Sequence, residues 1–290
     1  MRSALDIPQV AEVVVVDNAS GDDTIEHLRG IDDPRLRVIE HGTNEGFGAG
    51  HNGAARAATS DSLLLLNSDA LLTAEAVAGL EASLARDAHR SIVAPRLVTP
   101  DRVIQRSAGL LPTPLDLSIR ALGLHAPVRG LAQRSPLRSL IGHLPFAREH
   151  ASAETATDTI DTTMVSGACF AIGREAFWEL AGFDERFFMY FEDADLCRRA
   201  TAAGMPIRYV PSAVVTHIGG ASSSEDYHFG PLHARSMRQY LGKWYGPGGS
   251  ALAIVLLWLR AIGFSLAFRP GAKRTWRALW AAARDEDPRR

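Results

Sequence analysis

The sequence predicts an α/β protein whose core is a mostly parallel, doubly wound sheet. From Val13 to Arg86, short apolar runs alternate with polar turns and helix-forming stretches, as in a series of strand–loop–helix units. One run, Leu63–Leu66, is too short for an ordinary helix and lacks period-2 alternation, which is typical of a strand buried on both faces in a parallel sheet. Ligands of such sheets bind beyond the carboxyl ends of the strands, so we expect function in the loops that follow them.

The first half of the chain supplies most of the expected sheet. Val13–Val16 is a β-branched strand that ends in a polar turn, and a helix is expected at Thr24–Arg29. The elements that follow are expected, in chain order, to be a strand at Leu36–Glu40, a glycine-rich loop at His41–Gly50, an alanine-rich helix at Asn52–Thr59, the strand Leu63–Leu66 and a helix at Ala74–Arg86.

The segment Leu97–Thr157 differs in character, because prolines and arginines are scattered through it between short apolar pieces. We interpret residues 97–157 as a long, partly mobile insertion on the acceptor side of the site. The mixture of basic and apolar residues suits an anionic or membrane-near acceptor, but a solvated linker would have the same composition.

Regular structure is expected again from Thr163 to Ile172. The later elements are expected to be a helix at Arg174–Ala181, a turn at Gly182–Glu185, a helix at Leu196–Ala203 that Gly204 ends, and strands at Ile207–Val210 and Ala213–His217.

Composition limits the classes of function. The chain has 290 residues, a formal net charge of −2 and a pI near 6.6, so no nucleic-acid partner is expected. Cys169 and Cys197 lie far apart without CxxC spacing, which fits buried thiols in a reducing compartment. Residues 1–12 contain no apolar signal-peptide core, so we expect the catalytic part to face the cytosol.

Polar residues end the leucine strand abruptly at Asn67, Ser68 and Asp69. Oxygen ligands at this position would lie where a substrate binds, so one hypothesis is that Asp69 holds a divalent cation on a phosphate-bearing donor. The alternative is structural: Asn67 and Ser68 form a turn, and Asp69 caps the helix that begins near Thr73.

Three carboxylates, Glu192, Asp193 and Asp195, crowd the start of a helix. A structural interpretation is that they stabilise the helix N-terminus, where acidic groups interact favourably with the helix dipole. The functional interpretation is a general base for a sugar hydroxyl. The aromatic run Phe187–Phe191 would desolvate at least one carboxylate, and desolvation and like-charge neighbours raise a carboxyl pKa.

Two further patterns allow more than one interpretation. Gly48–Gly53 spells the GxGxxG dinucleotide fingerprint, but a long loop separates it from the strand that ends at Glu40, which disfavours an NAD-dependent oxidoreductase. His217 closes an apolar strand. Such a histidine is either a hydrogen-bonded core residue or a metal ligand that completes a shell of Asp69 and phosphate oxygens.

Five motifs occur in a fixed order along the chain: Val15–Ser20, Asn44–Gly48, Leu66–Ala70, Ser166–Cys169, and Gly182–Glu185 with Phe191–Leu196. Together they resemble glycosyltransferase family 2, in particular its rhamnosyltransferase-like bacterial branch, from about Val13 to Gly220. The resemblance implies a GT-A fold over residues 1–240, a nucleotide-sugar donor such as a dTDP- or UDP-sugar, bound Mg²⁺ or Mn²⁺, and inversion of the sugar's anomeric centre in one displacement.

The resemblance also implies roles for individual residues. Asp193 would be the base, with Glu192 its nearest rival, and Asp69 and His217 would bind the metal. The remaining implied sites are Asp17, Asn18, Asn44 and Ser68 for the nucleotide, and Ser166, Gly167 and Asp195 on the acceptor side.

The chain departs from the family pattern at two places. Asn67 replaces the first aspartate of the DxD motif, which removes one negative charge from the metal site. Only residues 1–12 precede the Val13 strand, whereas family members begin with a further central strand and helix, so we expect unpaired backbone groups on both of its neighbours. A non-catalytic relative that serves as a binding subunit is therefore an alternative function.

Residues 241–290 are expected to form membrane-associated helices. Ala251–Phe268 is apolar except for Arg260, which would be costly near mid-bilayer, and basic residues flank the segment on both sides. A helix lying in the cytoplasmic membrane interface, with Trp258, Trp276 and Trp280 as anchors, satisfies both observations. The alternative is a helix packed on the catalytic domain or on another subunit.

The function expected from the sequence is a peripheral, metal-dependent, inverting glycosyltransferase on the inner face of the cell membrane. We expect it to move L-rhamnose from dTDP-rhamnose to a polyprenyl-diphosphate-linked or glycan acceptor in cell-wall or surface-polysaccharide assembly.

Overall fold

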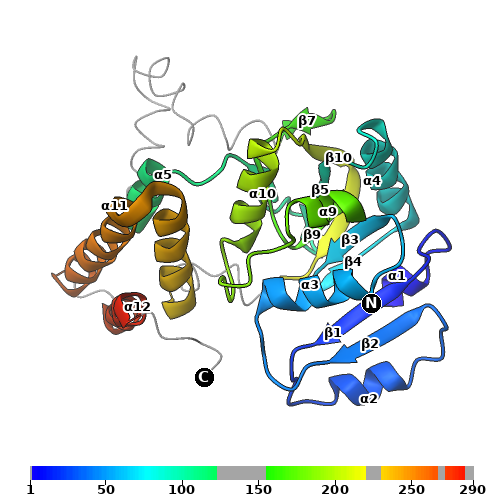
Figure 1. Ribbon diagram of the computed structural model, residues 1–290, viewed down its shortest axis with the longest axis horizontal. Coiled ribbons are helices and arrows are strands. Elements are labelled where there is room, and N and C mark those ends of the chain that lie inside the picture. Colours follow the sequence, from blue (N-terminus) through cyan, green and yellow to red (C-terminus); the bar gives the residue numbers. More distant parts are fainter. Residues whose placement is uncertain (1, 123–154, 220–229, 267–271, 285–290) are drawn as a thin grey trace.

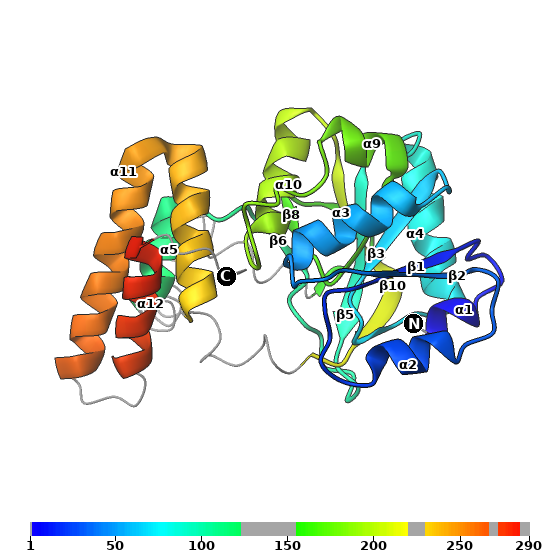
Figure 2. The same ribbon diagram turned by 60° about the horizontal axis from the view of Figure 1, so that its bottom comes forward.

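The computed structural model describes residues 2–122, 155–219, 230–266 and 272–284 (Figure 1). In Figures 1 and 2 an α/β lobe lies beside a smaller helical unit made of α5, α11 and α12. The strands are β1 (Val13–Asp17), β2 (Leu36–Glu40), β3 (Ser62–Leu66), β4 (Ala70–Leu71), β5 (Ile92–Val98), β6 (Ala108–Gly109), β7 (Ile160–Asp161), β8 (Met164–Val165), β9 (Cys169–Gly173) and β10 (Ile207–His217). The helices are α1 (Arg2–Leu5), α2 (Thr24–Arg29), α3 (Phe47–Ala57), α4 (Ala74–Arg86), α5 (Pro114–Ala121), α9 (Arg174–Glu179), α10 (Glu192–Ala202), α11 (Pro231–Leu266) and α12 (Ala272–Arg284).

The main sheet is mixed in direction. Its strand order is β3-β9-β5-β10-β4, with β7 paired to β10. β5 and β10 pair in parallel, whereas β9 runs antiparallel to both β3 and β5. The α/β class is as expected, but the leucine strand is not fully buried on both faces: Leu63 and Leu65 are buried while Leu64 and Leu66 are half-buried. Among the described strands, β3 is an edge strand with β9 as its neighbour.

β1 and β2 form a separate parallel pair that is not hydrogen-bonded to the main sheet. In the described part of the chain, one edge of β1 and one edge of β3 have no strand partner. Glu12 joins the beginnings of these strands, because its Oε1 accepts hydrogen bonds from the backbone N–H of Thr59 (2.6 Å) and of Ser60 (2.8 Å). A cavity of about 2450 Å³ is lined by residues of both strands, so an open groove lies between their edges.

Hydrogen bonds of the paired edges identify the amides that face this groove. Val13 N donates to Arg35 O, and His41 N donates to Asp17 O, so the backbone N–H and C=O groups of odd-numbered residues in β1 point toward β2. Asn67 N donates to Ala168 O, so the backbone N–H and C=O groups of odd-numbered residues in β3 point toward β9. Because backbone groups alternate along a strand, the even-numbered amides face the groove.

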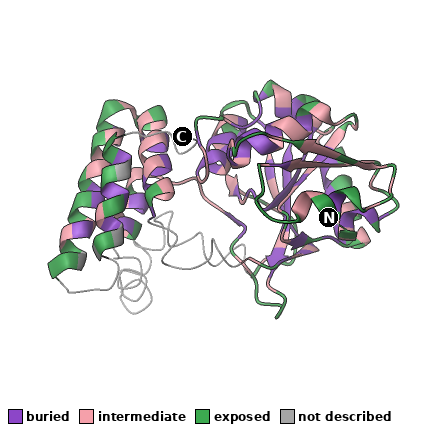
Figure 3. Cartoon of the chain, turned by 90° about the horizontal axis from the view of Figure 1, so that it is seen from below, coloured by how far each residue is buried: buried purple, intermediate pink, exposed green. Residues whose placement is uncertain are grey.

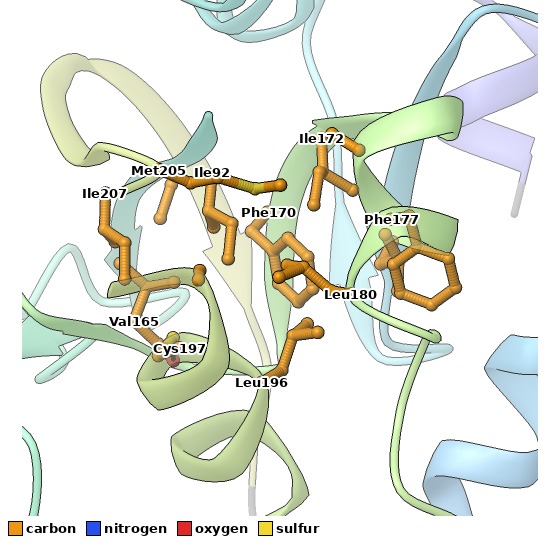
Figure 4. Close-up of a cluster of buried hydrophobic side chains, with 14 of the residues drawn as sticks. Ile92, Val165, Phe170, Ile172, Phe177, Leu180, Leu196, Cys197, Met205 and Ile207 are labelled. Carbon is orange, nitrogen blue, oxygen red and sulfur yellow. Dashed lines mark hydrogen bonds between the residues drawn. The ribbon is translucent and has the colours of Figure 1, made fainter. Parts of the chain in front are cut away.

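The core lies on both faces of the main sheet. On one face, Phe177 of α9 and Leu196 of α10 belong to one buried cluster with sheet residues such as Phe170 and Ile207 (Figure 4). On the other face, α4 contributes Leu80 and Leu84, both almost fully buried. Buried residues are concentrated on the sheet and the inner helix faces (Figure 3), so the sheet is a rigid support for the loops at its edge.

Part of the segment expected to be a mobile insertion is regular structure. Residues 97–98 belong to β5, β6 pairs with β8, and Thr113 and Asp116 form a reciprocal capping box at the start of α5. Residues 97–122 therefore contain regular elements within the expected insertion, and residues 123–154 lie outside the described part of the chain.

α11 breaks at Gly246, which has φ 68°, and Pro247 follows. After the break the helix folds back on itself, since Ser250 Oγ lies 3.5 Å from Arg238 O and a Cβ on Gly242 would lie 2.4 Å from Ser250 Oγ. The two halves are antiparallel in Figure 2. The expected domain boundary after residue 240 falls inside the first half of this helix, which packs on the α/β lobe.

Candidate active site

The loop after β1 is held by its own polar side chains. Asp17 is buried, and its Oδ2 accepts a hydrogen bond from Ser20 N at 3.0 Å. Asn18 Nδ2 donates to Gly46 O, and Gly46 N donates to Asn44 Oδ1, each at 3.0 Å. Asn18 lines the cavity and its Oδ1 is buried without a partner, whereas Asp17 and Asn44 are outside the lining. Contact of Asp17 or Asn44 with a nucleotide stays a prediction.

The loop after β3 places Asp69 beside His217, although the two residues are far apart in sequence. Asp69 Oδ1 lies 3.2 Å from His217 Nε2, and its Oδ2 accepts a hydrogen bond from Gly219 N at 3.2 Å. Asp69 is not a helix cap, because Thr73 Oγ1 accepts from Ala76 N and caps α4. Ser68 is exposed and lines the cavity.

The other ring nitrogen of His217 contacts Gln105, a residue that no sequence pattern singles out. His217 Nδ1 lies 2.7 Å from Gln105 Oε1, and Gln105 Nε2 donates to His217 O at 2.9 Å. His217 Nε2 is buried, and among the described residues it has no hydrogen-bond partner, although Asp69 Oδ1 lies 3.2 Å from it.

Asp69 and His217 fit a divalent cation that also binds phosphate. Asp69 Oδ1 faces the buried Nε2 of His217; a carboxylate is a usual ligand of Mn²⁺ and Mg²⁺, and a neutral imidazole nitrogen is a common metal ligand. The described residues contain no group of three or more His, Cys, Asp or Glu side chains that could hold a metal. The protein therefore offers two such ligands here, and a diphosphate would have to supply others.

Asp193 is the second residue of α10 and also lines the cavity. Its Oδ1 accepts from Ala194 N at 2.7 Å, and its Oδ2 accepts from Gly167 N at 3.1 Å. The two residues before α10, Tyr190 and Phe191, both have positive φ, 70° and 67°. This strained aromatic turn directs the start of the helix toward the cavity. Ser166 and Gly167 also line the cavity, as the sequence led us to expect of acceptor-side residues.

Burial and charge perturb the acidic pair at this helix start. Burial raises the pKa of Asp193 despite the opposing backbone hydrogen bonds from Gly167 and Ala194. Burial, and then the charge of Asp193, raise the pKa of Glu192 well above its ordinary value. Glu192 Oε2 is buried without a partner. A pair of carboxyls with raised pKa values in a cavity is the arrangement required of a general base near neutral pH.

Asp195, expected on the acceptor side, lies apart from the cavity. It is fully buried and absent from the cavity lining. Its Oδ2 pairs with Arg199 Nε at 2.9 Å, and its Oδ1 accepts from Trp244 Nε1 at 2.8 Å and pairs with Lys243 Nζ at 2.6 Å. Asp195 therefore joins α10 to α11.

The GxGxxG pattern lies inside α3 and not in a phosphate-binding loop, which contradicts the NAD interpretation. The glycines allow close packing: a Cβ on Gly48 would lie 2.9 Å from the Phe183 Cβ, and one on Gly50 would lie 3.0 Å from Asn18 Nδ2. Asn52 is structural, since it exchanges hydrogen bonds with the backbone of Phe183 at 2.9 Å. α3 begins at Phe47, so the expected glycine-rich loop is shorter and the helix starts earlier.

The cavity has other polar lining residues that sequence reasoning missed. His51 lines it beside Phe47 and Phe183, and burial lowers the pKa of its imidazole, which favours the neutral ring at neutral pH. Arg106 and Arg120, from the segment between β5 and residue 122, also line the cavity. Their positive charge suits an anionic ligand.

Comparison with known proteins identifies the family. The sequence profile of the family described as "Glycosyltransferase like family 2" matches residues 1–242. This chain belongs to glycosyltransferase-like family 2.

Relatives within the family include rhamnosyltransferases. The chain is 28% identical over 229 residues to an N-acetylglucosaminyl-diphospho-decaprenol L-rhamnosyltransferase of Mycobacterium tuberculosis, a match that covers 74% of this chain and 68% of the relative. It is 26% identical over 198 residues to the low-salt glycan biosynthesis hexosyltransferase Agl10 of Haloferax volcanii, which covers 67% of this chain and 54% of the relative.

Solved structures confirm the GT-A fold. GalNAc-T7, crystallised with UDP, GalNAc and Mn²⁺, superposes with a TM-score of 0.55 at 16% identity, over 82% of this chain and 42% of that chain. The mannosyltransferase PcManGT of Pyrobaculum calidifontis, in complex with GDP-Man and Mn²⁺, superposes with a TM-score of 0.50 at 19% identity, over 94% and 77% of the two chains. The GT-A fold expected from the motifs is therefore confirmed.

Proposed function

We propose that this glycosyltransferase is a metal-dependent, inverting enzyme that transfers L-rhamnose from dTDP-rhamnose to a lipid-linked acceptor in cell-wall or surface-glycan assembly. The observation that carries the proposal is one cavity that holds a cation-binding pair, Asp69 and His217, together with a buried carboxylate, Asp193, whose pKa is raised. The choice of rhamnose and of a lipid-linked acceptor is supported by the name of the M. tuberculosis relative.

The proposed reaction needs a base for the acceptor hydroxyl and positive charge for the leaving group. Asp193 accepts the proton of the acceptor hydroxyl as that oxygen bonds to the anomeric carbon and the bond from that carbon to the donor phosphate breaks. Asp69 and His217 would hold Mg²⁺ or Mn²⁺, which would supply positive charge to the departing nucleoside diphosphate. Backbone N–H groups of Gly167 and Ala194 hold the Asp193 carboxylate in place throughout.

Thermal unfolding with nucleotides tests the donor site. A ligand at 100 times its Kd stabilises a protein by about 2.7 kcal/mol, which shifts the Tm of a domain of this size by several degrees. We expect a shift with dTDP that requires Mn²⁺, and no shift with NAD. A Tm that no nucleotide changes would contradict the proposed enzyme and favour a non-catalytic binding subunit.

We also propose that the helical unit attaches the enzyme to the inner face of the cell membrane. Large apolar side chains of α11 and α12 are exposed on it, including Trp258 (51%), Leu266 (75%) and Trp280 (60%), and the basic residues Lys273 and Arg277 are exposed beside them. Trp, Leu and basic residues on one helical surface are typical of binding in the membrane interface. Within the described residues, Pro231–Gly263 is long and apolar enough to cross a membrane by length and composition.

The internal contacts of α11 support a surface location over a span. Gly246 breaks the helix, and Arg260 Nη1 donates to Ala121 O of α5 at 2.9 Å, so this half of the helix is bound to its neighbours by a polar contact. Sedimentation with vesicles containing anionic lipid tests the proposal. We expect Trp258→Glu and Trp280→Glu to weaken vesicle binding, and Leu71→Glu, which changes an exposed apolar residue of β4, to leave it unchanged. Equal vesicle binding by all three variants would contradict the proposal.

A further inference from the structure

Gln105 lies at a fixed point between β5 and β6. Its backbone N donates to Leu97 O at 2.9 Å, and the neighbouring Ile104 forms a β-bridge with Val98 at the end of β5. The side chain is therefore projected from a sheet edge and not from a free loop, and it reaches His217 at the end of β10.

Hydrogen bonding fixes which way the Gln105 amide faces. A backbone carbonyl can only accept a hydrogen bond, so the group 2.9 Å from His217 O must be the amide NH₂. The amide oxygen of Gln105 then faces His217 Nδ1 at 2.7 Å. An amide oxygen also only accepts, so Nδ1 of His217 must carry a proton.

This arrangement determines the chemistry of the other ring nitrogen. With the proton on Nδ1, the neutral imidazole has its lone pair on Nε2. Nε2 is buried, lacks a hydrogen-bond partner and faces Asp69 Oδ1 at 3.2 Å. Ligand atoms at right angles about a small divalent cation, each about 2.1 Å from it, are about 3.0 Å apart, so this separation suits two neighbouring ligands.

We propose that Gln105 is a positioning residue that holds His217 in the Nδ1–H tautomer and sets its ring plane, so that Nε2 is available as a metal ligand beside Asp69. The inference rests on the proposed metal-dependent function. Outer-shell hydrogen bonds of this kind fix the tautomer and orientation of a ligating histidine, and their loss lowers metal affinity by about 10- to 100-fold.

Two substitutions separate the hydrogen bonds of Gln105. Gln105→Leu removes both, while Gln105→Glu keeps an acceptor for Nδ1 and removes the donor to His217 O. Gln239→Leu makes the same change in α11, away from the cavity lining, and serves as the matched control. Thermal unfolding verifies that each variant is folded.

The first readout is the tautomer of His217 in the metal-free protein, measured from ¹⁵N–¹³C NMR of the ring at a pH where the ring is neutral. We expect Nδ1–H in the wild type, in Gln105→Glu and in Gln239→Leu, and a mixture or the Nε2–H form in Gln105→Leu. A wild-type ring in the Nε2–H form, or an unchanged tautomer in Gln105→Leu, would overturn the proposal. This readout does not depend on glycosyl transfer.

The second readout is Mn²⁺ affinity in the presence of dTDP, whose diphosphate supplies further ligands, measured by the EPR signal of free Mn²⁺. We expect Gln105→Leu to weaken binding by about 10- to 100-fold, and Gln105→Glu and Gln239→Leu to stay within about threefold of the wild type. Equal Mn²⁺ affinity in Gln105→Leu and the wild type would overturn the positioning role. If the wild type binds no Mn²⁺ while nucleotide binding persists, the ligand role of His217 fails and the donor site stands.

Discussion

Replacing Asp193 by asparagine removes the charge of the candidate base with little change in shape. General-base catalysis contributes about 10²- to 10⁴-fold in rate, so we expect kcat to fall by at least about 100-fold. The carboxylate accepts one hydrogen bond on each oxygen, from Ala194 N at 2.7 Å and from Gly167 N at 3.1 Å. An asparagine can accept only one of them, and a buried donor that loses its acceptor costs about 1–3 kcal/mol of stability.

The assay must separate the loss of the base from this loss of stability. Sugar transfer from dTDP-rhamnose gives kcat, and the Tm shift with dTDP and Mn²⁺ reports the donor site, which Asp193→Asn should leave intact. Asp195→Asn is the matched control, because it makes the same change two residues along α10 in a residue that does not line the cavity. We expect it to lower the Tm while kcat stays within about tenfold of the wild type. If turnover of Asp193→Asn stays within tenfold of the wild type, Asp193 is not the base and Glu192 becomes the candidate.

Three further predictions concern stability and exchange. Burial and the charge of Asp193 raise the pKa of Glu192, so its ionised form opposes folding above the unfolded pKa of about 4.3; Glu192→Gln should raise the Tm at pH 7, with the gain vanishing below about pH 4. Asp195→Ala should lower the free energy of unfolding by about 3–5 kcal/mol in denaturant titrations, because it removes a fully buried carboxylate that pairs with Arg199 and Lys243, whereas Glu81→Ala at an exposed pair should change it little. In hydrogen exchange, the groove-facing amides should exchange faster than the paired amides beside them. The groove-facing set is Val14, Val16, Leu64 and Leu66, and the paired set is Val13, Val15, Leu63 and Leu65. Equal protection of the two sets would mean that a strand occupies the groove.

The sequence predicted the parts of the site that follow strands directly. Asp69 comes just after a strand, and the carboxyl ends of strands meet at one edge of an α/β sheet, so it was expected beside a ligand; Asn18 was expected there from the family resemblance. Strand direction was less predictable. β9 follows a long intervening segment, and apolar periodicity carries no information on whether a strand returns parallel or antiparallel to its neighbours.

Other residues could not be assigned, because their roles depend on contacts between distant segments. Gly48 and Gly50 match a phosphate-loop spacing, but they allow α3 to approach Phe183 and Asn18, which no local pattern reveals. Gln105 lies within a segment whose composition is that of a linker, and it acquires a role through a partner at the end of β10.

α10 links the reaction site to the helical unit. Residues two apart in a helix point in different directions, so Asp193 faces the cavity while Asp195 faces α11. Lys243 also pairs with Asp184 at 2.7 Å. Burial acts to raise the pKa of Asp184, but hydrogen bonds from Arg186 and Lys243 outweigh it and lower this pKa. The contact therefore persists over the physiological pH range. Because the exposed apolar surface of α11 and α12 is thereby fixed relative to the start of α10, a membrane bound to that surface would hold a lipid-linked acceptor at a defined position relative to Asp193.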